Sequence, residues 1–342
     1  METYLEDVLS QPASLQQCVE GLYQPLLMEK LHVICQRSYS NVIFTGMGSS
    51  NYCSISADAL LKRNGKSCFR YSTSELIHYH LNVIRPDTLV VINSQSGESA
   101  EIIKLLEHLS NDIVTIAVCN NSESPLAQKA TLFLPMNSEP EESVTTRTYL
   151  ASIVIDILIA KTYLGLSYRD YLLSVLEMSS NMETFFKDVS LVDAALKNSI
   201  GFPPQLCLIG RGCSTATTKS GALFLREIAC YPAFSELGGE FRHGPMEMVH
   251  EHFYGIVVAA NDATTGLAHK MTAEIQEHGG HVVAISNENW LDVPTIVVPE
   301  TEEWLSPLVT ILPIQLYADS LAKQKGRRAG SFRWGSKITR EE

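Results

Sequence analysis

Two short apolar runs, each ending in a glycine-containing turn, stand out in the hydrophobic pattern of the chain. Residues 41–50 read NVIFTGMGSS and residues 205–214 read QLCLIGRGCS, so both runs close with Gly-x-Gly-x-Ser. A buried parallel strand that passes through a tight turn into a helix has this pattern. We therefore predict a strand and a following helix at each place.

The segments after the two glycine turns follow a similar order. After the first turn we predict strands at residues 67–72, 88–94 and 113–119. Helices are predicted before, between and after the first two of these strands, at 51–64, around Glu75 and at 99–110. After the second turn we predict a helix at residues 215–230, followed by a connector. A strand at 254–260, a helix at 264–278 and a strand at 281–286 come next. Strands that alternate with helices predict βαβ units and parallel sheets. Two such sets, about 160 residues apart, predict tandem domains of one α/β fold.

The domain boundaries follow from these elements. We predict a helical leader over residues 1–39, a first α/β domain over 40–167 and a helical linker over 168–200. A second α/β domain then covers 201–325, and 326–342 form a C-terminal tail.

The apolar stretch 149–166 is nearly long enough to cross a bilayer. It carries Asp156 and Lys161 and has no flanking charge pattern. We therefore predict a buried helix of a large core, and no membrane partner.

The loop Ser94–Ser99, with the sequence SQSGES, follows the strongly apolar strand 88–94 and precedes an amphipathic helix. Ligands of open α/β sheets bind at the carboxyl ends of strands, and the free N–H groups of a helix N-terminus suit a phosphate. No Walker lysine follows, which favours a phosphate monoester over a nucleoside triphosphate. The other interpretation is an ordinary capping turn, since serine and glycine collect there as well. The corresponding turn of the second copy, AANDATT, lacks the SxSG pattern, so we expect the phosphate site in the first copy alone.

A carboxylate and a histidine in the second copy are candidates for acid–base chemistry. Helical spacing places Ser220, Phe224 and Glu227 on one stripe. The residues expected to face the core are Ala222, Leu223, Leu225 and Ile228. A carboxylate with apolar neighbours near a helix end has a raised pKa, which suits proton transfer; the alternative is a solvated glutamate paired with Arg226.

The turn GGEFRHGP, residues 238–245, holds His243 between glycines and a proline. Such a turn gives an imidazole a defined position, as a general acid or base requires. The pairs His78/His80 and His250/His252 lack a third ligand at a recognisable spacing, so we predict no metal site. Nothing in the sequence indicates a cofactor.

Composition narrows the function further. The 342 residues carry a formal net charge of −12, which argues against nucleic acid as a partner but leaves room for a small anionic ligand. The eight cysteines include no CxxC motif, and the N-terminus has no signal-peptide core, so we expect a cytoplasmic protein with free thiols.

Taken together, these segments resemble the sugar isomerase (SIS) domain family in its tandem form. The likeness covers roughly residues 30–342 and rests on SQSGES, VTTRTY, GRG followed by GAL-x-L-x-E, and EFRHGP. It is greatest to the isomerase half of glucosamine-6-phosphate synthase and to the fructosamine- and glucosamine-6-phosphate deglycases. The resemblance implies two tandem SIS domains, each a parallel β-sheet flanked by helices in a flavodoxin-like three-layer sandwich.

The resemblance also implies roles for residues at matching positions. The phosphate of a sugar substrate is expected to bind Ser94, Gln95, Ser96 and Ser99, with help from Ser50. Glu227 is expected to move a proton between C1 and C2 of the sugar, and His243 to open the sugar ring. Lys337 is expected to close over the site with the tail. Since the histidine of the family is often supplied by a neighbouring subunit, a homodimer or higher homo-oligomer is implied.

Two departures from the synthase point to breakdown rather than synthesis. A short helical leader stands where the synthase carries a glutaminase domain, so we expect no ammonia source in this chain. Phe224 stands where the synthase helix carries a lysine. We therefore predict a deglycase that releases hexose 6-phosphate and an amine from a 6-phosphorylated sugar–amine.

Three other functions stay open at this point. They are an aldose–ketose phosphosugar isomerase, a glucosamine-6-phosphate deaminase, and a non-catalytic sugar-phosphate sensor. The residues expected to line the rest of the site are Gly48, Thr146, Arg147, Phe224 and Glu240.

Overall fold

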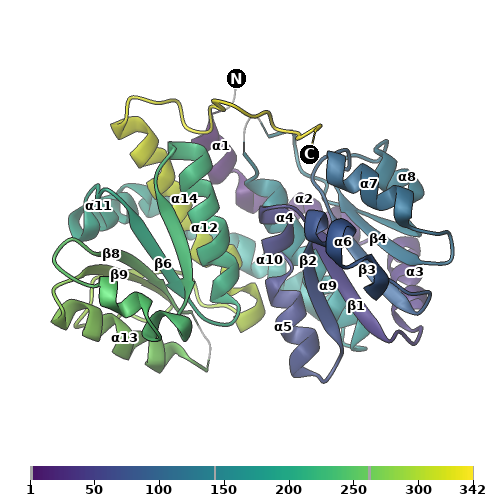
Figure 1. Cartoon of the computed structure of the whole chain (residues 1–342), viewed down its shortest axis with the longest axis horizontal. Coiled ribbons are helices and arrows are strands. Elements are labelled where there is room, and N and C mark those ends of the chain that lie inside the picture. Colours follow the sequence, from purple (N-terminus) through teal and green to yellow (C-terminus); the bar gives the residue numbers. More distant parts are fainter. Residues whose placement is uncertain (1–2, 142–143, 261–262, 342) are drawn as a thin grey trace. The chain divides into compact units, whose positions relative to one another are not determined.

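The computed structural model describes residues 3–141, 144–260 and 263–341. It contains two five-stranded sheets in which every paired strand is parallel, and Figure 1 shows each sheet with its helices. The strand orders are β2-β1-β3-β4-β5 and β7-β6-β8-β9-β10, which are the same order when each sheet is counted along the chain. The predicted α/β fold with two copies of one domain is confirmed.

The chain divides into two compact units. Unit 2 consists of Ser10–Glu141, Thr145–Ser179 and Phe332–Glu342, and unit 1 consists of Met1–Leu9, Glu142–Val144 and Ser180–Ser331. The leader and the linker predicted from the sequence are thus shared between the units, and the last segment of the tail belongs to unit 2.

Unit 2 holds the first sheet. Its strands are β1 (Asn41–Gly46), β2 (Cys68–Ser72), β3 (Thr88–Asn93), β4 (Val114–Cys119) and β5 (Leu132–Pro135). Its helices include α2 (Gln11–Leu22), α3 (Pro25–Cys35), α4 (Ser49–Tyr52), α5 (Ile55–Arg63), α6 (Thr73–Tyr79), α7 (Ala100–His108), α8 (Pro125–Lys129) and α9 (Arg147–Tyr163). Helix α9 is buried along nearly its whole length and packs against α5, α2 and α3, as predicted for the apolar stretch 149–166.

Unit 1 holds the second sheet. Its strands are β6 (Leu206–Gly210), β7 (Ala233–Leu237), β8 (Tyr254–Val258), β9 (His281–Ser286) and β10 (Thr295–Val297). Its helices include α1 (Tyr4–Leu9), α11 (Val189–Ile200), α12 (Ser214–Ala229), α13 (Thr265–Glu277) and α14 (Ser306–Gln324), while α10 (Tyr168–Phe185) begins in unit 2 and ends in unit 1.

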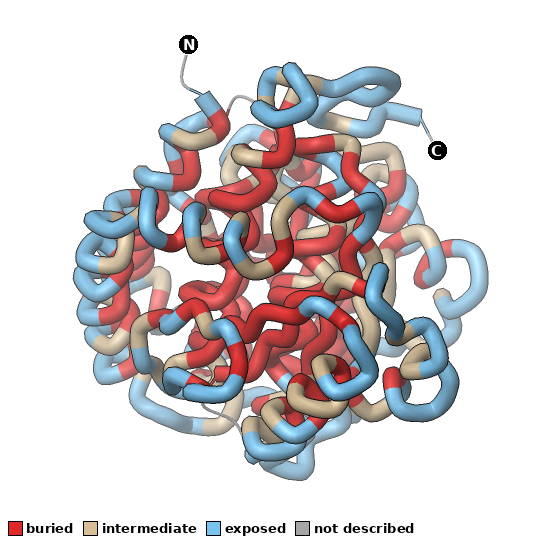
Figure 2. The backbone as a smooth tube through the Cα atoms, turned by 90° about the vertical axis from the view of Figure 1, so that its left-hand side faces the viewer, coloured by how far each residue is buried: buried red, intermediate tan, exposed pale blue. Residues whose placement is uncertain are grey.

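The central strands of both sheets carry the core. All six residues of β3 and of β4 are buried, as are all five of β6, and Figure 2 shows the buried backbone inside a rim of exposed helical turns. Such strands must be apolar on both faces, which is why they appear as continuous hydrophobic runs in the sequence.

One described helical segment, Glu303–Gln324, is long and apolar enough to cross a membrane, and 94% of its most apolar window is buried inside the protein. A core helix of a large α/β protein has these properties as well. Burial of this kind explains the hydropathy without a bilayer.

Candidate functional site

The Ser94–Ser99 loop connects the carboxyl end of β3 to α7 and is held by its own side chains. The Ser94 hydroxyl accepts a hydrogen bond from Gly97 N–H at 3.0 Å, and the Ser96 hydroxyl accepts one from Glu98 N–H at 3.2 Å. Asn120 N–H donates to the carbonyl of Gln95 at 3.1 Å, which fixes the loop to the end of β4. Ser94 is buried, whereas Gln95, Ser96 and Ser99 are partly exposed and remain accessible to a ligand.

Gly97 is required by the shape of this loop. Its φ of +70° lies in the left-handed region, and a Cβ at this position would lie 2.3 Å from Ser124 Oγ and 2.9 Å from Cys119 Sγ. Any side chain would therefore be both strained and in contact with its neighbours. The loop forms as the sequence predicts because a glycine is available at its tightest point.

Helix α7 begins immediately after the loop, as predicted. Ser99 is its N-cap in an extended conformation, and its hydroxyl accepts no hydrogen bond from the N–H groups of the helix, so it is not used for capping. The N–H of Ala100 donates to the carbonyl of Thr339 at 3.1 Å, so the tail already satisfies one N–H group of the first turn. A cavity of about 510 Å³ beside this turn is lined by Glu98, Ala100, Ile103, Lys104, Pro125 and Arg340.

The first glycine turn lies directly against the end of β3. A Cβ on Gly46 would lie 2.5 Å from the carbonyl oxygen of Ser50 and 2.8 Å from that of Asn93. The main chains of the turn and of β3 therefore approach more closely than any other residue would allow at position 46. Ser50 and the Ser94–Ser99 loop thus follow the carboxyl ends of the neighbouring strands β1 and β3, at the same edge of the sheet. Gly48, a predicted lining residue, adopts a φ of 52° in this turn.

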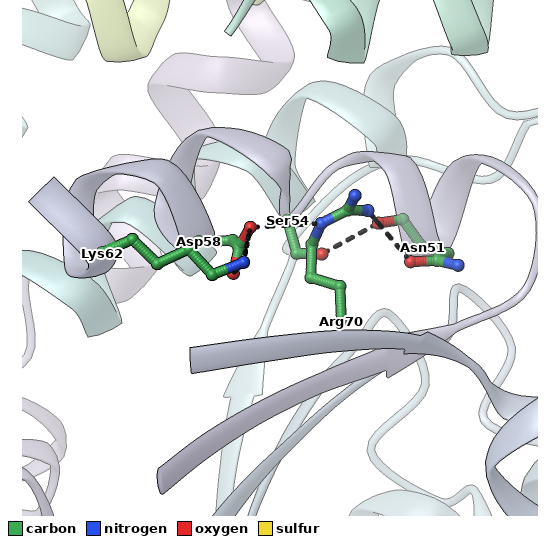
Figure 3. Close-up of polar contacts among 5 residues, drawn as sticks. All are labelled: Asn51, Ser54, Asp58, Lys62 and Arg70. Atoms are coloured by element: carbon green, nitrogen blue, oxygen red, sulfur yellow. Dashed lines mark hydrogen bonds and ion pairs between the residues drawn. The ribbon is translucent and has the colours of Figure 1, made fainter. Parts of the chain in front are cut away.

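Arg70 on β2 supports the glycine turn from the side. Its guanidinium Nη1 donates to both the main-chain and the side-chain oxygen of Asn51, each at 3.3 Å. Figure 3 shows Arg70 between Asn51 and Asp58, with Lys62 bonded to Asp58 at 2.8 Å. Ser54 donates to the Asn51 carbonyl at 2.8 Å, in the short break between α4 and α5. These contacts fix the residue that follows Ser50.

The amino end of α9 is organised by Glu141, a residue that the sequence analysis did not select. The Glu141 carboxylate accepts hydrogen bonds from the N–H groups of Thr146 and Thr148 at 2.8 and 2.9 Å, and from both of their hydroxyls. Glu141 therefore caps α9 although it lies several residues before the helix in the sequence. A glutamate ahead of a threonine-rich helix start was the available signal.

Three of the predicted site residues gather near this helix start. Thr146 is fully buried under the Glu141 carboxylate. Arg147 is also buried, and its guanidinium donates to the Pro140 carbonyl at 2.8 Å and to Ser10 Oγ at 3.2 Å. The ammonium group of Lys337 donates to the main-chain carbonyl of Glu141. In this structure Thr146 and Arg147 support the fold, and Lys337 attaches the tail to unit 2.

Glu227 lies in the last turn of α12 in unit 1. The helix ends at Cys230 in a left-handed conformation, and Tyr231 N–H donates to the Leu225 carbonyl at 3.1 Å. Glu227 is solvent-exposed. Even so, desolvation by nearby protein atoms raises its pKa to about 7, against a smaller opposite effect of Arg226. The two observations agree if solvent touches one side of the carboxylate while protein crowds the other, which leaves it accessible but poorly hydrated.

Two of the three residues predicted to form a stripe on α12, Ser220 and Phe224, are part of the buried core. Ser220 and Phe224 are fully buried together with Ala222, Leu225 and Ile228, whereas Leu223 is partly exposed. Phe224 therefore offers no surface to a ligand in this structure. Helical spacing gives the angle of a side chain around the helix but does not say how far the neighbouring elements wrap around it.

His243 lies on the exposed turn between β7 and β8. Phe241 anchors the turn in the core, His243 N–H donates to the Glu240 carbonyl at 2.8 Å, and Gly244 follows with a φ of 138°. The His243 and Glu240 side chains are both exposed. The histidine is thus in a defined position with its ring open to solvent.

The structure assigns the predicted residues to two groups. Unit 2 holds Gly48, Ser50, Ser94, Gln95, Ser96, Ser99, Thr146, Arg147 and Lys337, and unit 1 holds Phe224, Glu227, Glu240 and His243. The turn after β8, which corresponds to the phosphate loop in the second copy, lies partly outside the described residues, at 261–262. Within the described residues, no group of three or more His, Cys, Asp or Glu side chains is placed to hold a metal ion.

Comparison with known proteins identifies the family of the chain. The SIS domain family model matches residues 37–161 and 203–292. The chain is 29% identical over 350 residues to a glutamine–fructose-6-phosphate aminotransferase of Thermococcus kodakarensis, and the match covers 94% of this chain and 55% of the relative. A second such enzyme, from Pyrococcus horikoshii, is 28% identical over 342 residues with the same two coverages. The chain therefore spans about half the length of these relatives.

Solved structures share the fold. The C-terminal domain of glucosamine-fructose-6-phosphate aminotransferase from Francisella tularensis has a TM-score of 0.83 at 20% identity, over 97% of this chain and 99% of that one. A glucosamine-6-phosphate deaminase from Thermotoga maritima has a TM-score of 0.80 at 17% identity, over 99% of this chain and 100% of that one. Identities this low establish the arrangement of elements and leave the reaction open.

Proposed function

Since the chain belongs to the SIS domain family, we propose that it is an enzyme acting on a phosphorylated sugar. More specifically, we propose a deglycase that cleaves a 6-phosphorylated sugar–amine, of the fructoselysine or glucoselysine type, into hexose 6-phosphate and a free amine. The relatives named above act, by their names, on fructose 6-phosphate or glucosamine 6-phosphate, which supports a phosphorylated hexose as the substrate class.

The observation that carries the proposal is the state of Glu227. A carboxylate with a pKa of about 7 is divided between its base and acid forms near neutral pH, so it can both take and return a proton. An ordinary solvated glutamate would be a much weaker base. The partly exposed hydroxyls of Ser96 and Ser99, next to the start of α7, support a phosphate site in the same chain.

The proposed reaction moves one proton and then adds water. His243 opens the sugar ring to the free ketoamine. Glu227 takes a proton from C1 as O2 is protonated, which gives the enaminol. Return of a proton to C2, with loss of the proton on the amine nitrogen, gives the imine between C1 and that nitrogen, and O2 remains a hydroxyl. Water adds to C1, the C1–N bond breaks, and hexose 6-phosphate and the amine are released.

Other activities would use the same groups. An aldose–ketose isomerase would move the same proton on an unsubstituted hexose phosphate, and a glucosamine-6-phosphate deaminase would release ammonia. A sensor would bind the phosphate without any need for Glu227 or His243. Phe224, in place of the lysine expected in a synthase-type helix, supports the deglycase over synthase-like isomerisation.

The test is incubation with a panel of 6-phosphorylated compounds followed by identification of the products. The panel holds fructoselysine 6-phosphate, glucoselysine 6-phosphate, fructose 6-phosphate and glucosamine 6-phosphate. We expect hexose 6-phosphate and lysine from a conjugate, with little turnover of the other two. Turnover confined to fructose 6-phosphate or glucosamine 6-phosphate would replace the deglycase by the isomerase or the deaminase.

The Glu227→Gln variant tests the role of the carboxylate. The amide keeps the size of the side chain but cannot accept the proton, so we expect a loss of about 10²–10⁴-fold in kcat. Glu277→Gln, at the exposed end of α13, removes a charge elsewhere and serves as the matched control. Near-wild-type activity of Glu227→Gln would exclude Glu227 as the catalytic base.

A further inference from the structure

A small polar cluster lies buried behind the two turns of the phosphate site. Asp156, from the middle of α9, has no exposed surface. Its Oδ2 accepts a hydrogen bond from the side-chain amide of Asn93 at 3.0 Å and one from the Cys53 thiol at 3.4 Å. Asn93 and Cys53 are themselves buried to 1% exposure or less.

The cluster connects two segments that are far apart in the sequence. Asn93 is the last residue of β3, so the Ser94–Ser99 loop begins at the next residue. Cys53 follows α4, the short helix that continues the Gly46–Ser50 turn, and its thiol also contacts the Ser50 carbonyl at 3.2 Å. Asp156 therefore bonds, through one oxygen, to a neighbour of each turn.

Burying this polar cluster costs folding free energy, and a core made only of apolar side chains would not have that cost. No described cation forms an ion pair with Asp156. Asp156 Oδ1 and Asn93 Oδ1 have no hydrogen-bond partner. An uncompensated polar group of this kind destabilises a folded protein by about 1–3 kcal/mol. An apolar residue at position 156 would remove that cost, as it does along the rest of α9, where Ile, Leu and Val predominate.

We propose that Asp156 is a positioning residue of the phosphate site, which fixes the Ser94–Ser99 loop and the Gly46–Ser50 turn relative to each other through Asn93 and Cys53. This inference rests on the proposed phosphate site. The close approach of Gly46 to the carbonyls of Ser50 and Asn93 leaves the two turns little freedom in one direction. The Asp156 bridge adds a side-chain restraint between the residues next to the two turns.

Binding of inorganic phosphate and of glucose 6-phosphate, measured by calorimetry, tests the proposal with three variants on α9. Asp156→Asn keeps an oxygen that accepts both hydrogen bonds, and we expect its Kd to stay within about threefold of wild type. Asp156→Leu removes the bridge at similar size, and we expect a rise in Kd of about tenfold or more, as for a misplaced binding group. Thr162→Val is the matched control, because this buried hydroxyl bonds only to the Leu158 carbonyl of its own helix.

Circular dichroism and the melting temperature show whether each variant is folded. If Asp156→Leu does not fold, Asn93→Ala removes the same bridge from the strand side and should show the same rise in Kd. A folded Asp156→Leu or Asn93→Ala with wild-type affinity would overturn the proposal and leave the phosphate site in place. A wild-type protein that binds neither phosphate nor glucose 6-phosphate would overturn the phosphate site and this inference with it.

Discussion

At the scale of single residues, Glu227 is exposed and yet has a raised pKa. Both properties bear on the pH dependence of activity. The carboxylate must be unprotonated to accept the substrate proton. Because its pKa is raised to about 7, we expect kcat/KM to rise with pH and to level off above about pH 7. An ordinary glutamate would give a plateau from about pH 5 upward.

The measurement is a kcat/KM profile from pH 5 to 9 with the phosphorylated substrate. The Glu277→Gln control should retain the same acid limb. A wild-type profile that is flat down to pH 5 would show that desolvation does not shift Glu227 in the free enzyme.

Asp156 has a pH effect of its own, on stability. Burial raises its pKa from 3.8 to about 8, and the hydrogen bonds from Cys53 and Asn93 lower it by less. Between these values the folded protein keeps a proton that the unfolded chain has released, so folding takes up a proton. The stability that Asp156 contributes is therefore complete below about pH 4 and is lost as the pH rises to about 8.

The Asp156→Asn variant cannot titrate and isolates this effect. We expect its free energy of unfolding, relative to wild type, to increase between pH 4 and 8 by at most about 1.4 kcal/mol per pH unit. Denaturant unfolding at several pH values checks this. A difference that does not change with pH would mean that Asp156 is ionised in the folded protein.

At the scale of elements, Gly97 and Gly65 form a matched pair. Both have a φ of +70°, but a Cβ at Gly65, just after α5, would meet nothing within 4 Å, whereas one at Gly97 would meet Ser124 and Cys119. Alanine at Gly65 costs the left-handed backbone alone, about 1–2 kcal/mol of stability. Alanine at Gly97 adds overpacking of about 1–3 kcal/mol.

We therefore expect Gly97→Ala to be the more destabilised of the two variants in denaturant unfolding. It should also lose phosphate affinity, which Gly65→Ala should keep. Equal stability and equal affinity would mean that the loop yields to a side chain at no cost.

The elements that could be predicted from sequence are those whose burial is complete. Strands such as β3 and β6 and helices such as α7 and α9 were predicted within a few residues. The edge strands β5, β7 and β10 were missed, because they are short and partly exposed and so lack a continuous apolar run. Helix α14 was missed as well, and it contains Pro313 in its interior, a residue that normally indicates a helix end.

The local structure around the candidate site was predictable for a different reason. The glycine turns and the serine loop are local, so their sequence shows them. The Glu141 cap is local, and a glutamate ahead of a threonine-rich helix start indicates it, but the Asp156 bridge joins residues that are 63 and 103 positions apart. No periodicity indicates such partners.

At the scale of the whole molecule, the expected sharing of His243 between subunits is testable by mixing two inactive variants. If the histidine of one subunit serves the Glu227 of its neighbour, a dimer of one Glu227→Gln chain and one His243→Ala chain contains one intact site. Random pairing should then restore about a quarter of wild-type activity, because half of the dimers are mixed and each has one working site of two.

Co-expression of the two variants followed by an activity assay measures this. Each variant alone is the control and should be inactive. If mixing restores nothing although mixed oligomers are isolated by differential tagging, the histidine acts within its own chain.

The identical strand order of the two sheets has a consequence for how the chain can evolve. A chain with two copies of one fold does not need every feature in both, and the serine loop follows β3 but not its counterpart β8. On the proposed function, we expect the first copy to be under selection for a ligand-binding turn, and the second for its helix end and histidine turn. In saturation mutagenesis scored by growth, the turn after β3 should therefore tolerate fewer changes than its counterpart after β8, whereas equivalent core positions should be constrained in both copies.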